Sequence, residues 1–386
     1  MRFYMREISL AILFCFLSLM SSGLYMLGMA IVWLIFCLLI NYNKIGNIRL
    51  LNGDYWLVFI FVFYCIFSIA VNKYNSSVDI YIVALLYMFF SYFSVSLLLS
   101  YNICLGVKIF RFLIVILCCS LLVQIMVYWV GGYYVDFNSL FSFGYSESRY
   151  LSKTLQEFEI IRPTSFFTEP SNASAVISIV TFCYLILLKK VDGYVFLGFI
   201  SSMMTLSTAG ILICSISISV IFIFNRSGIK NILLKYGLIP VISFTLIALF
   251  LMFSYERLNN VSEYDMLATR SVLVDMVLNQ DSLFHIFGNG INVISTPVYN
   301  KGYYIYDYTI RDSGFLLNSY YSFGIFGTIA FVVWSRIKLK DNMHFILFFI
   351  ILNGKFDYLQ PVFWMLIFIV SMIPRNRNAV LGNEGG

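Results

Sequence analysis

Uncharged apolar segments long enough to cross a lipid bilayer recur from one end of this 386-residue chain to the other. A crossing helix needs about 20 consecutive, mainly apolar residues. Hydrophobic residues make up 61% of the chain and charged residues 11%, and the mean hydropathy is +0.88. Soluble domains are about half apolar and a quarter charged, so the composition excludes that class. Because backbone polar groups in lipid must find partners within their own segment, we expect an all-α polytopic membrane protein.

Apolar runs with polar ends predict individual crossings. The clear ones lie near Tyr55–Val71, Ile80–Ser100, Phe112–Val130, Ala173–Leu188, Tyr236–Ser254, Phe315–Trp334 and Tyr358–Ile373. Leu10–Ile40 and Tyr194–Phe224 each fit one bent helix or a hairpin, and Met343–Leu352 is short for a crossing. The basic start Met1–Glu7 with the apolar run Ile8–Met20 resembles a secretory signal. No small-residue cleavage site follows it, so we expect a first anchor helix instead.

The positions of lysine and arginine decide the ambiguous regions, because cytoplasmic loops collect these residues. Cations flank all three regions on both sides: Arg2/Arg6 and Lys44/Arg49, Lys189/Lys190 and Arg226/Lys230, and Arg336/Lys338/Lys340 and Arg375/Arg377. Each region must therefore cross an even number of times. This predicts about 12 transmembrane helices in a single membrane domain over residues 1–386, with both termini in the cytoplasm.

Two long loops then fall on the outer face, at about residues 131–170 and 255–314, and they hold 12 of the 19 acidic residues. Loops of this length in a compact protein are usually functional or disordered. Both are rich in aromatic residues, which disfavours disorder. These aromatics, Tyr303 and Tyr304 among them, are either anchors at the membrane interface or a stacking surface for sugar rings.

Two places in these loops carry unusual polar residues. The segment Arg162–Ser174 crowds an arginine, a glutamate, hydroxyls and two prolines against the start of a membrane helix. In the helix predicted over Val261–Leu278, Arg270 falls on the apolar face together with Glu263. A cation there pairs with Glu263 or clamps an anionic ligand, and a guanidinium group suits phosphate geometry.

Several classes of chemistry lack their sequence signals. The chain has only two histidines, no Cys/His spacing typical of a metal site and no glycine-rich phosphate loop, so we expect no metal and no cofactor. No cysteine falls in the outer loops, so we expect no disulfide there. The net charge of +6 comes mostly from cytoplasmic cations and does not imply nucleic acid. The predicted spans contain no ionisable residue near their middle, which disfavours an ion-coupled transporter.

Four patches of sequence resemble the bacterial O-antigen polymerases, the Wzy family, which are related to the O-antigen ligases. The patches are Arg162-Pro-Thr-Ser-Phe-Phe-Thr-Glu-Pro-Ser171, Thr205-Leu-Ser-Thr-Ala-Gly-Ile211, Arg270 with Phe287-Gly288-Asn289-Gly290, and Asp312-Ser-Gly-Phe-Leu-Leu-Asn-Ser-Tyr-Tyr-Ser-Phe-Gly-Ile-Phe-Gly327. Thr208 stands where the family usually has a basic residue. Asp312-Ser313 stands where the ligases tend to carry His-Asn.

The resemblance implies a glycosyltransferase of GT-C-like architecture in the bacterial inner membrane. Its donor would be a growing glycan on undecaprenyl pyrophosphate, and its acceptor a fresh repeat unit on the same lipid carrier. A separate co-polymerase that sets the chain length is implied as a partner. The alternatives are a flippase or transporter of lipid-linked repeat units, and another O-antigen ligase or capsule polymerase.

For the implied reaction we expect two arginines, Arg162 and Arg270, to contact the pyrophosphate, because they stabilise negative charge on the leaving group. Further residues expected to bind substrate are Ser165, Ser171, Tyr303 and Tyr304. The attacking hydroxyl needs a carboxylate or an imidazole within hydrogen-bond reach. The candidate bases are Glu169, Asp312 and His285. Both carboxylates also fit a helix-start role, in which a lowered pKa would make a poor base.

Overall fold

The computed structural model describes residues 5–19, 24–41, 55–71, 78–142, 148–150, 161–224, 274–275, 277–291, 298–300, 303–305, 314–355 and 358–372. Apart from one short hairpin, the secondary structure in these ranges is helical. In chain order the elements are α1 (Met5–Leu19), α2 (Leu24–Ile40), α4 (Tyr55–Val71), α5 (Val78–Tyr101), α6 (Ile103–Gly131), α7 (Phe137–Ser142), α8 (Pro170–Leu188), α9 (Gly193–Met204), α10 (Thr208–Phe224), α13 (Ser282–Phe287), β1 (Val298–Asn300), β2 (Tyr303–Ile305), α14 (Phe315–Lys338), α15 (Asn342–Leu352) and α16 (Pro361–Met372).

Four of these helices, α5, α6, α8 and α14, are long and apolar enough to cross a membrane. Six shorter apolar helices accompany them within the described ranges. Helix α6 has 29 residues, which corresponds to about 43 Å at 1.5 Å per residue. That exceeds the roughly 30 Å of a hydrocarbon core. Length and composition are those of a membrane protein, as the sequence predicted.

The apolar runs predicted most helix positions well. Helix α4 has the predicted bounds, and both ambiguous runs form two helices instead of one bent helix. The break between α9 and α10 lies at Thr205–Ser207, so Thr208 starts a helix. Helix α6 starts at Ile103, nine residues before the predicted crossing at Phe112. The crossing predicted at 236–254 lies outside the described residues.

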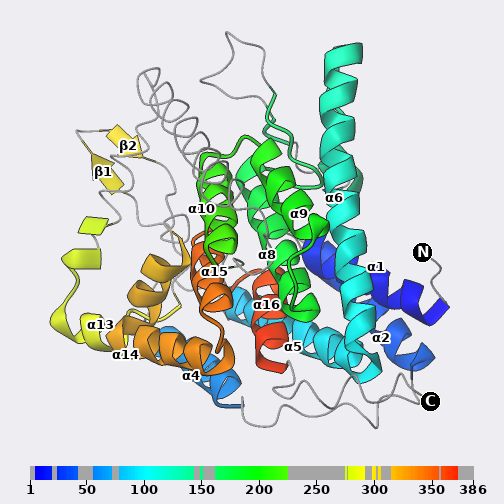
Figure 1. Ribbon diagram of the computed structural model, residues 1–386. Helices are drawn as coiled ribbons and strands as arrows, with labels where there is room; N and C mark the ends of the chain where they lie inside the picture. The colour runs from blue at the N-terminus through cyan, green and yellow to red at the C-terminus, as the bar shows by residue number, and fades with distance from the viewer. Residues whose placement is uncertain are drawn as a thin grey trace.

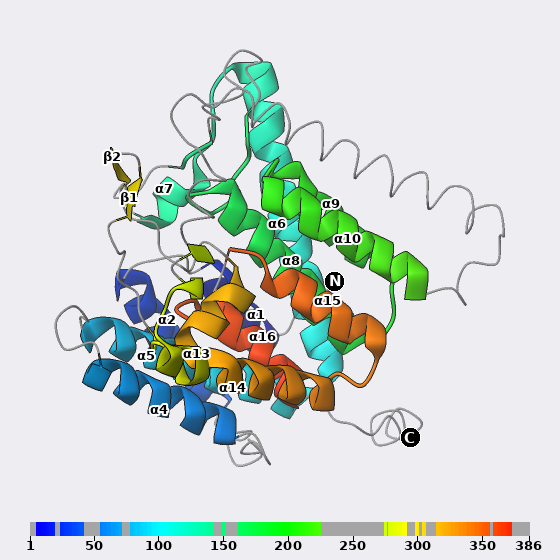
Figure 2. The same cartoon turned by 90° about the vertical axis from the view of Figure 1, so that its left-hand side faces the viewer.

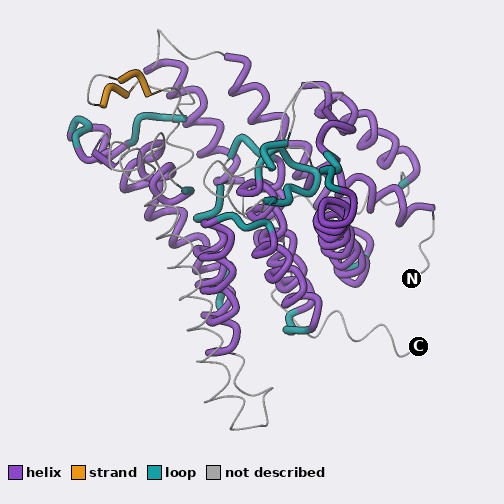
Figure 3. The backbone as a smooth tube through the Cα atoms, turned by 90° about the horizontal axis from the view of Figure 1, so that it is seen from above, coloured by secondary structure: helices purple, strands orange, loops and turns teal. Residues whose placement is uncertain are grey.

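The helices form two groups joined by α16 (Figure 1). Helices α6, α8, α9 and α10 pack side by side, and α4, α5, α13 and α14 lie together in a second group. The second group runs in a different direction from the first, as the turned view shows (Figure 2). Seen from above, the loops of the described chain gather near the middle of the molecule (Figure 3). Turns that connect several helices therefore lie close to one another in this region.

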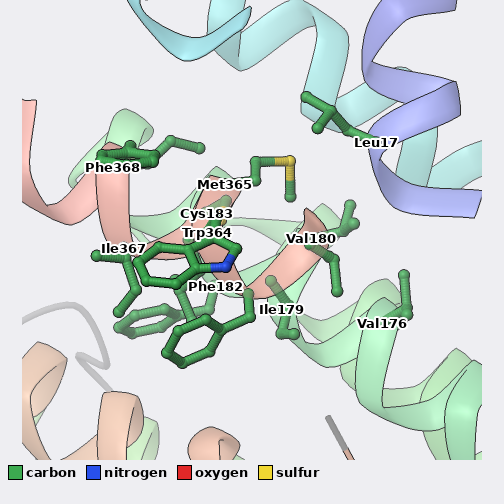
Figure 4. Packing of buried hydrophobic residues seen from close by; sticks show 14 of the residues in the cluster. Leu17, Val176, Ile179, Val180, Phe182, Cys183, Trp364, Met365, Ile367 and Phe368 are labelled. Carbon is green, nitrogen blue, oxygen red and sulfur yellow. The ribbon is translucent and has the colours of Figure 1, made fainter. Parts of the chain in front are cut away.

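The core lies where α16 meets α5 and α8. Every residue from Pro361 to Ser371 is buried, and so is nearly all of α8. Trp364 and Met365 of α16 pack beside Phe182 and Val180 of α8 (Figure 4). An apolar helix with no polar face is expected at the centre of a large bundle, and α16 has this composition.

Small residues line the contact of α8 with α9 and α10. Gly210 of α10 lies against Ser174 of α8. The hydroxyls of Ser178 and Ser202 are 3.1 Å apart, and Ser202 also donates to the Ser174 carbonyl over 2.9 Å. Small side chains allow helix backbones to approach closely, and their hydroxyls supply interhelical hydrogen bonds in an apolar setting. This packing fixes the start of α10 beside the start of α8.

Candidate functional site

The first patch, 162–171, runs as irregular chain into α8. The N–H of Arg162 donates to the carbonyl of Tyr150 over 2.9 Å, and the N–H of Arg149 donates to the carbonyl of Thr168 over 2.7 Å. These bonds lay the patch antiparallel to the stretch 148–150. Pro170 then occupies the first helical position of α8, where its fixed φ and missing N–H are well suited. The patch is thus held on one side by a second loop segment and ends in a rigid helix.

Gln124 of α6 holds the turn at Thr164 and Ser165 from the other side. The Gln124 side chain is fully buried. Its carbonyl oxygen accepts the N–H groups of Thr164 (3.1 Å) and Ser165 (2.8 Å). Its amide donates to the carbonyls of Ser165 (3.1 Å) and Val135 (3.0 Å). Irregular backbone among apolar helices must find its partners inside the protein, and this single side chain satisfies four such groups.

Ser165, predicted to bind substrate, lies at the centre of that turn. Its φ of 53° is left-handed, which is uncommon for a residue other than glycine. Its side chain is fully buried, and its Oγ lies 2.5 Å from Oγ of Ser120. These contacts position the turn, and the role of Ser165 in substrate binding stays a prediction. Ser171, the other predicted serine, is half-buried in the first turn of α8.

Arg162 connects the first patch to the second. Its Nε donates to the carbonyl of Leu206 over 3.3 Å. Leu206 lies in the turn between α9 and α10, where its φ is 50°, and the side chain of Arg162 is half-buried. Two patches that are about 40 residues apart in the sequence therefore meet at the side chain that we predicted to contact pyrophosphate.

Glu169 lies between two cations from distant parts of the chain. Its Oε1 is 2.9 Å from Nη1 of Arg149, and its Oε2 is 2.8 Å from Nζ of Lys355 in the α15–α16 turn. The Ser171 hydroxyl also donates to Oε2 over 3.2 Å. Burial alone would raise the pKa of the Glu169 carboxyl. The hydrogen bond and charge of Lys355, the charge of Arg149 and the Ser171 hydroxyl outweigh burial and hold this pKa below its ordinary value.

The third and fourth patches also meet each other. Helix α14 is interrupted at Gly324, whose φ of 65° and ψ of −169° suit glycine. At this interruption the N–H of Asn289 donates to the carbonyl of Tyr321 over 2.8 Å, and that of Gly290 donates to the carbonyl of Ser322 over 2.9 Å. Helix carbonyls near the break thus bond to the loop segment that follows α13.

His285, the third candidate base, lies in α13 beside α14. Its Nδ1 is 2.8 Å from the hydroxyl of Tyr320 and 3.2 Å from Nε2 of Gln280. Gln280 in turn accepts from Asn289 Nδ2 at its Oε1 over 2.7 Å. The amide of Gln280 therefore donates to Nδ1, and the neutral imidazole carries its proton on Nε2. In this tautomer, Nε2 is a donor and Nδ1 is already occupied.

The turn between α15 and α16 connects the two pairs of patches. On one side Lys355 binds Glu169. On the other, the hydroxyl of Tyr358 lies 3.0 Å from that of Ser322 in α14. Tyr358 is buried, and its carbonyl accepts from the indole N–H of Trp364 over 2.8 Å. The turn is thus anchored in the core, and its lysine is presented at the start of α8.

Some predicted residues cannot be placed. Arg270 and Asp312 lie outside the described residues, and so does the expected pair of Arg270 with Glu263. Tyr303 and Tyr304 belong to β2, which pairs antiparallel with β1. The backbone of these two residues therefore lies in a short hairpin.

The residues that organise the site but were not singled out are Gln124, Arg149 and Lys355. The sequence does distinguish Lys355, because it is a single cation in a short turn between two apolar runs, predicted on the outer face. It also distinguishes Gln124, as the only amide side chain within the apolar run of α6. No sequence feature distinguished Arg149 from an ordinary solvated arginine in a loop. Neither feature names the partner, because each partner is distant in the sequence.

Within the described ranges, no group of three or more His, Cys, Asp and Glu side chains is arranged to hold a metal ion. The eight cysteines are all free and lie in helices. No family model, curated protein or solved structure matches the chain.

Proposed function

We propose that this protein is an O-antigen polymerase, a membrane glycosyltransferase that joins lipid-linked oligosaccharide repeat units. The observation that supports the proposal is the meeting of patches that resemble this family. The first patch contacts the second through Arg162, the third contacts the fourth at the interruption of α14, and the α15–α16 turn touches both pairs. Patches that are far apart in the sequence are thus neighbours in the fold, as residues of one site must be.

The proposed setting is the bacterial inner membrane, with about 12 crossings, both termini in the cytoplasm and a GT-C-like architecture. Helix α6 supports an outer position for the site. Exposed Lys108 and Trp129 lie 21 residues apart on α6, which is about 31 Å and matches the hydrocarbon thickness. Gln124 and Ser120, which hold the first patch, then lie about 7–14 Å inward from Trp129. Both residues therefore lie in the half of the bilayer nearer to Trp129.

The proposed reaction is transfer of a growing glycan from undecaprenyl pyrophosphate to a new repeat unit on the same carrier. A hydroxyl oxygen of the acceptor sugar bonds to the anomeric carbon of the donor, and the bond from that carbon to the pyrophosphate oxygen breaks. Undecaprenyl pyrophosphate leaves with the bonding electrons, and the hydroxyl proton passes to a base. Arginine side chains stabilise the charge that develops on the leaving group. A chain-length co-polymerase is the proposed partner.

Purified protein reconstituted with undecaprenyl-pyrophosphate-linked repeat units tests the proposal. We expect a ladder of glycans, each one repeat longer than the last, together with release of undecaprenyl pyrophosphate. Repeat units that remain single in the presence of folded protein would refute it.

A deletion strain separates the polymerase from a flippase. Loss of a polymerase leaves single repeat units on the lipopolysaccharide, whereas loss of a flippase leaves none. A flippase phenotype would move the assignment to that class.

A further inference from the structure

Within the described residues, Glu169 is a carboxylate that pairs with two cations, Arg149 and Lys355. One oxygen faces Arg149 and the other faces Lys355 and Ser171, at 2.8–3.2 Å. Glu169 itself is only 21% exposed at its side chain. A general base needs an oxygen lone pair that can reach the substrate hydroxyl. Here both oxygens are directed at cations that the fold supplies.

The three charges leave the cluster with a net charge of +1, because two cations surround one carboxylate. The cations are the accessible members: the side chain of Arg149 is 79% exposed and that of Lys355 is 35% exposed. A guanidinium group can bind two phosphate oxygens at once, and an ammonium group adds a compact charge. Arg162 lies in the same patch, on the chain segment paired with Arg149.

We propose that Glu169 is the counter-ion that positions Lys355 and Arg149, and that these two cations bind the pyrophosphate of the lipid-linked substrate. This inference rests on the proposed function for the identity of the ligand. Glu169 and Ser171 hold the ammonium group of Lys355 at the start of α8, and the buried Tyr358 anchors the turn that carries it. Proton acceptance then falls to another group, and Asp312 is the remaining candidate, because Nδ1 of His285 is already occupied.

Lys355→Ala should weaken binding of undecaprenyl pyrophosphate by about 10- to 100-fold, the range for losing one charge-assisted hydrogen bond. It should raise KM for the lipid-linked donor while kcat stays within a few-fold of the wild type. Glu169→Gln removes a negative charge from the site but keeps its shape. Because it loses the counter-ion that positions Lys355 and Arg149, it should bind undecaprenyl pyrophosphate a few-fold more weakly than the wild type. Its kcat should stay within about 10-fold of the wild type, because no proton acceptor is lost.

The measurement is equilibrium binding of undecaprenyl pyrophosphate to the purified full chain in detergent, with ladder formation measured on the same samples. Lys108→Ala is the matched control, because Lys108 is an exposed lysine near the opposite end of α6. Lys355→Ala leaves Glu169 paired with Arg149. The double variant Glu169→Gln/Lys355→Ala removes both charges of this ion pair. It therefore tests the loss of Lys355 without leaving the Glu169 charge behind, and it serves as the control for folding. Inorganic pyrophosphate should compete with the lipid in the wild type and compete less well in both Lys355 variants.

Several results would overturn the inference. The first three concern binding: no lipid binding by the wild type, unchanged lipid binding in both Lys355 variants, or no competition by inorganic pyrophosphate. The fourth is a folded Glu169→Gln that binds lipid but loses turnover by more than about 100-fold. The last result would make Glu169 the base. Lys355-dependent binding without any ladder from repeat units would instead refute the proposed polymerase while the pyrophosphate site stands.

Discussion

Replacing Gln124 should release the turn that carries the first patch. The Gln124 side chain bonds to four backbone groups, belonging to Thr164, Ser165 and Val135. In Gln124→Ala, the N–H of Thr164 keeps one partner, the hydroxyl of Tyr134 at 3.0 Å. The N–H and carbonyl of Ser165 and the carbonyl of Val135 each lose the hydrogen bond to Gln124.

The free energy of unfolding should fall accordingly. Hydrogen bonds between membrane segments average about 0.6 kcal/mol, and typical protein hydrogen bonds contribute about 0.5–1.5 kcal/mol. Four hydrogen bonds are lost, but Thr164 keeps its second partner, so the three other backbone groups predict a loss of about 2–4 kcal/mol. Gln124→Glu should be no better near neutral pH, because a carboxylate would face the carbonyls of Ser165 and Val135 without a proton to donate.

Denaturant titration of the purified protein in mixed micelles measures this loss, with ladder formation as the second readout. Val123→Ala is the matched control, because Val123 is the neighbouring residue of α6 and is 43% exposed. It should cost less than about 1 kcal/mol. Our account of the turn would be refuted if Gln124→Ala and Gln124→Glu unfolded at the same denaturant concentration as Val123→Ala.

Three further predictions follow from the packing, the ion pairs and the charge pattern. Gly210→Ala should cost about 1–3 kcal/mol, since its new methyl group would lie 2.6 Å from the facing side chain of α8, whereas Gly28→Ala meets nothing within 4 Å and should be neutral or stabilising in the same unfolding assay. Folding lowers the pKa of Glu169, so its ion pairs stabilise the protein at pH values above the ordinary glutamate pKa of about 4.3. This stabilisation is lost as the pH falls through the lower pKa of the folded state. Melting temperatures of Glu169→Gln, measured against pH, should lack this decline in acid. Reporter fusions should be periplasmic at Tyr150 and cytoplasmic at Lys190, and a periplasmic signal at Lys190 would contradict the charge-based topology.

Helix positions were predictable where hydropathy alone decides them. Helix α4 has the bounds of its apolar run, because polar residues stop the run at both ends. The start of α6 was predicted too late, because Lys108 and Arg111 interrupt the run. In the structure, the guanidinium group of Arg111 lies 4.7 Å from the ring centroid of Tyr194 and donates to the Tyr184 hydroxyl. These partners offset the cost of a cation in the helix, and they are invisible in a local run of residues.

The interruption of α14 was not predictable for a related reason. A Gly-x-x-Gly step such as Gly324–Gly327 is compatible with a continuous helix, and nothing next to it in the sequence breaks the hydrogen-bond ladder. The Asn289 and Gly290 N–H groups, which bond to helix carbonyls there, come from a segment more than 30 residues earlier. Irregular backbone at such a place requires partners from elsewhere in the protein. The sequence shows the glycines Gly324 and Gly327, but the interruption of α14 at Gly324 depends on contacts with the distant segment that contains Asn289 and Gly290.

The same principle explains how an irregular, charged segment can persist beside apolar helices. The side chain of Gln124 accepts hydrogen bonds from the backbone N–H groups of Thr164 and Ser165. The turn therefore does not need water to satisfy these groups. The charged groups lie at the rim of the segment, where Glu169 pairs with Lys355 and Arg149. Neutral hydrogen bonds therefore fix the buried part, and ionic contacts are confined to the accessible part. In the proposed site, a ligand would contact the exposed sides of these cations while Glu169 and the turn keep their positions.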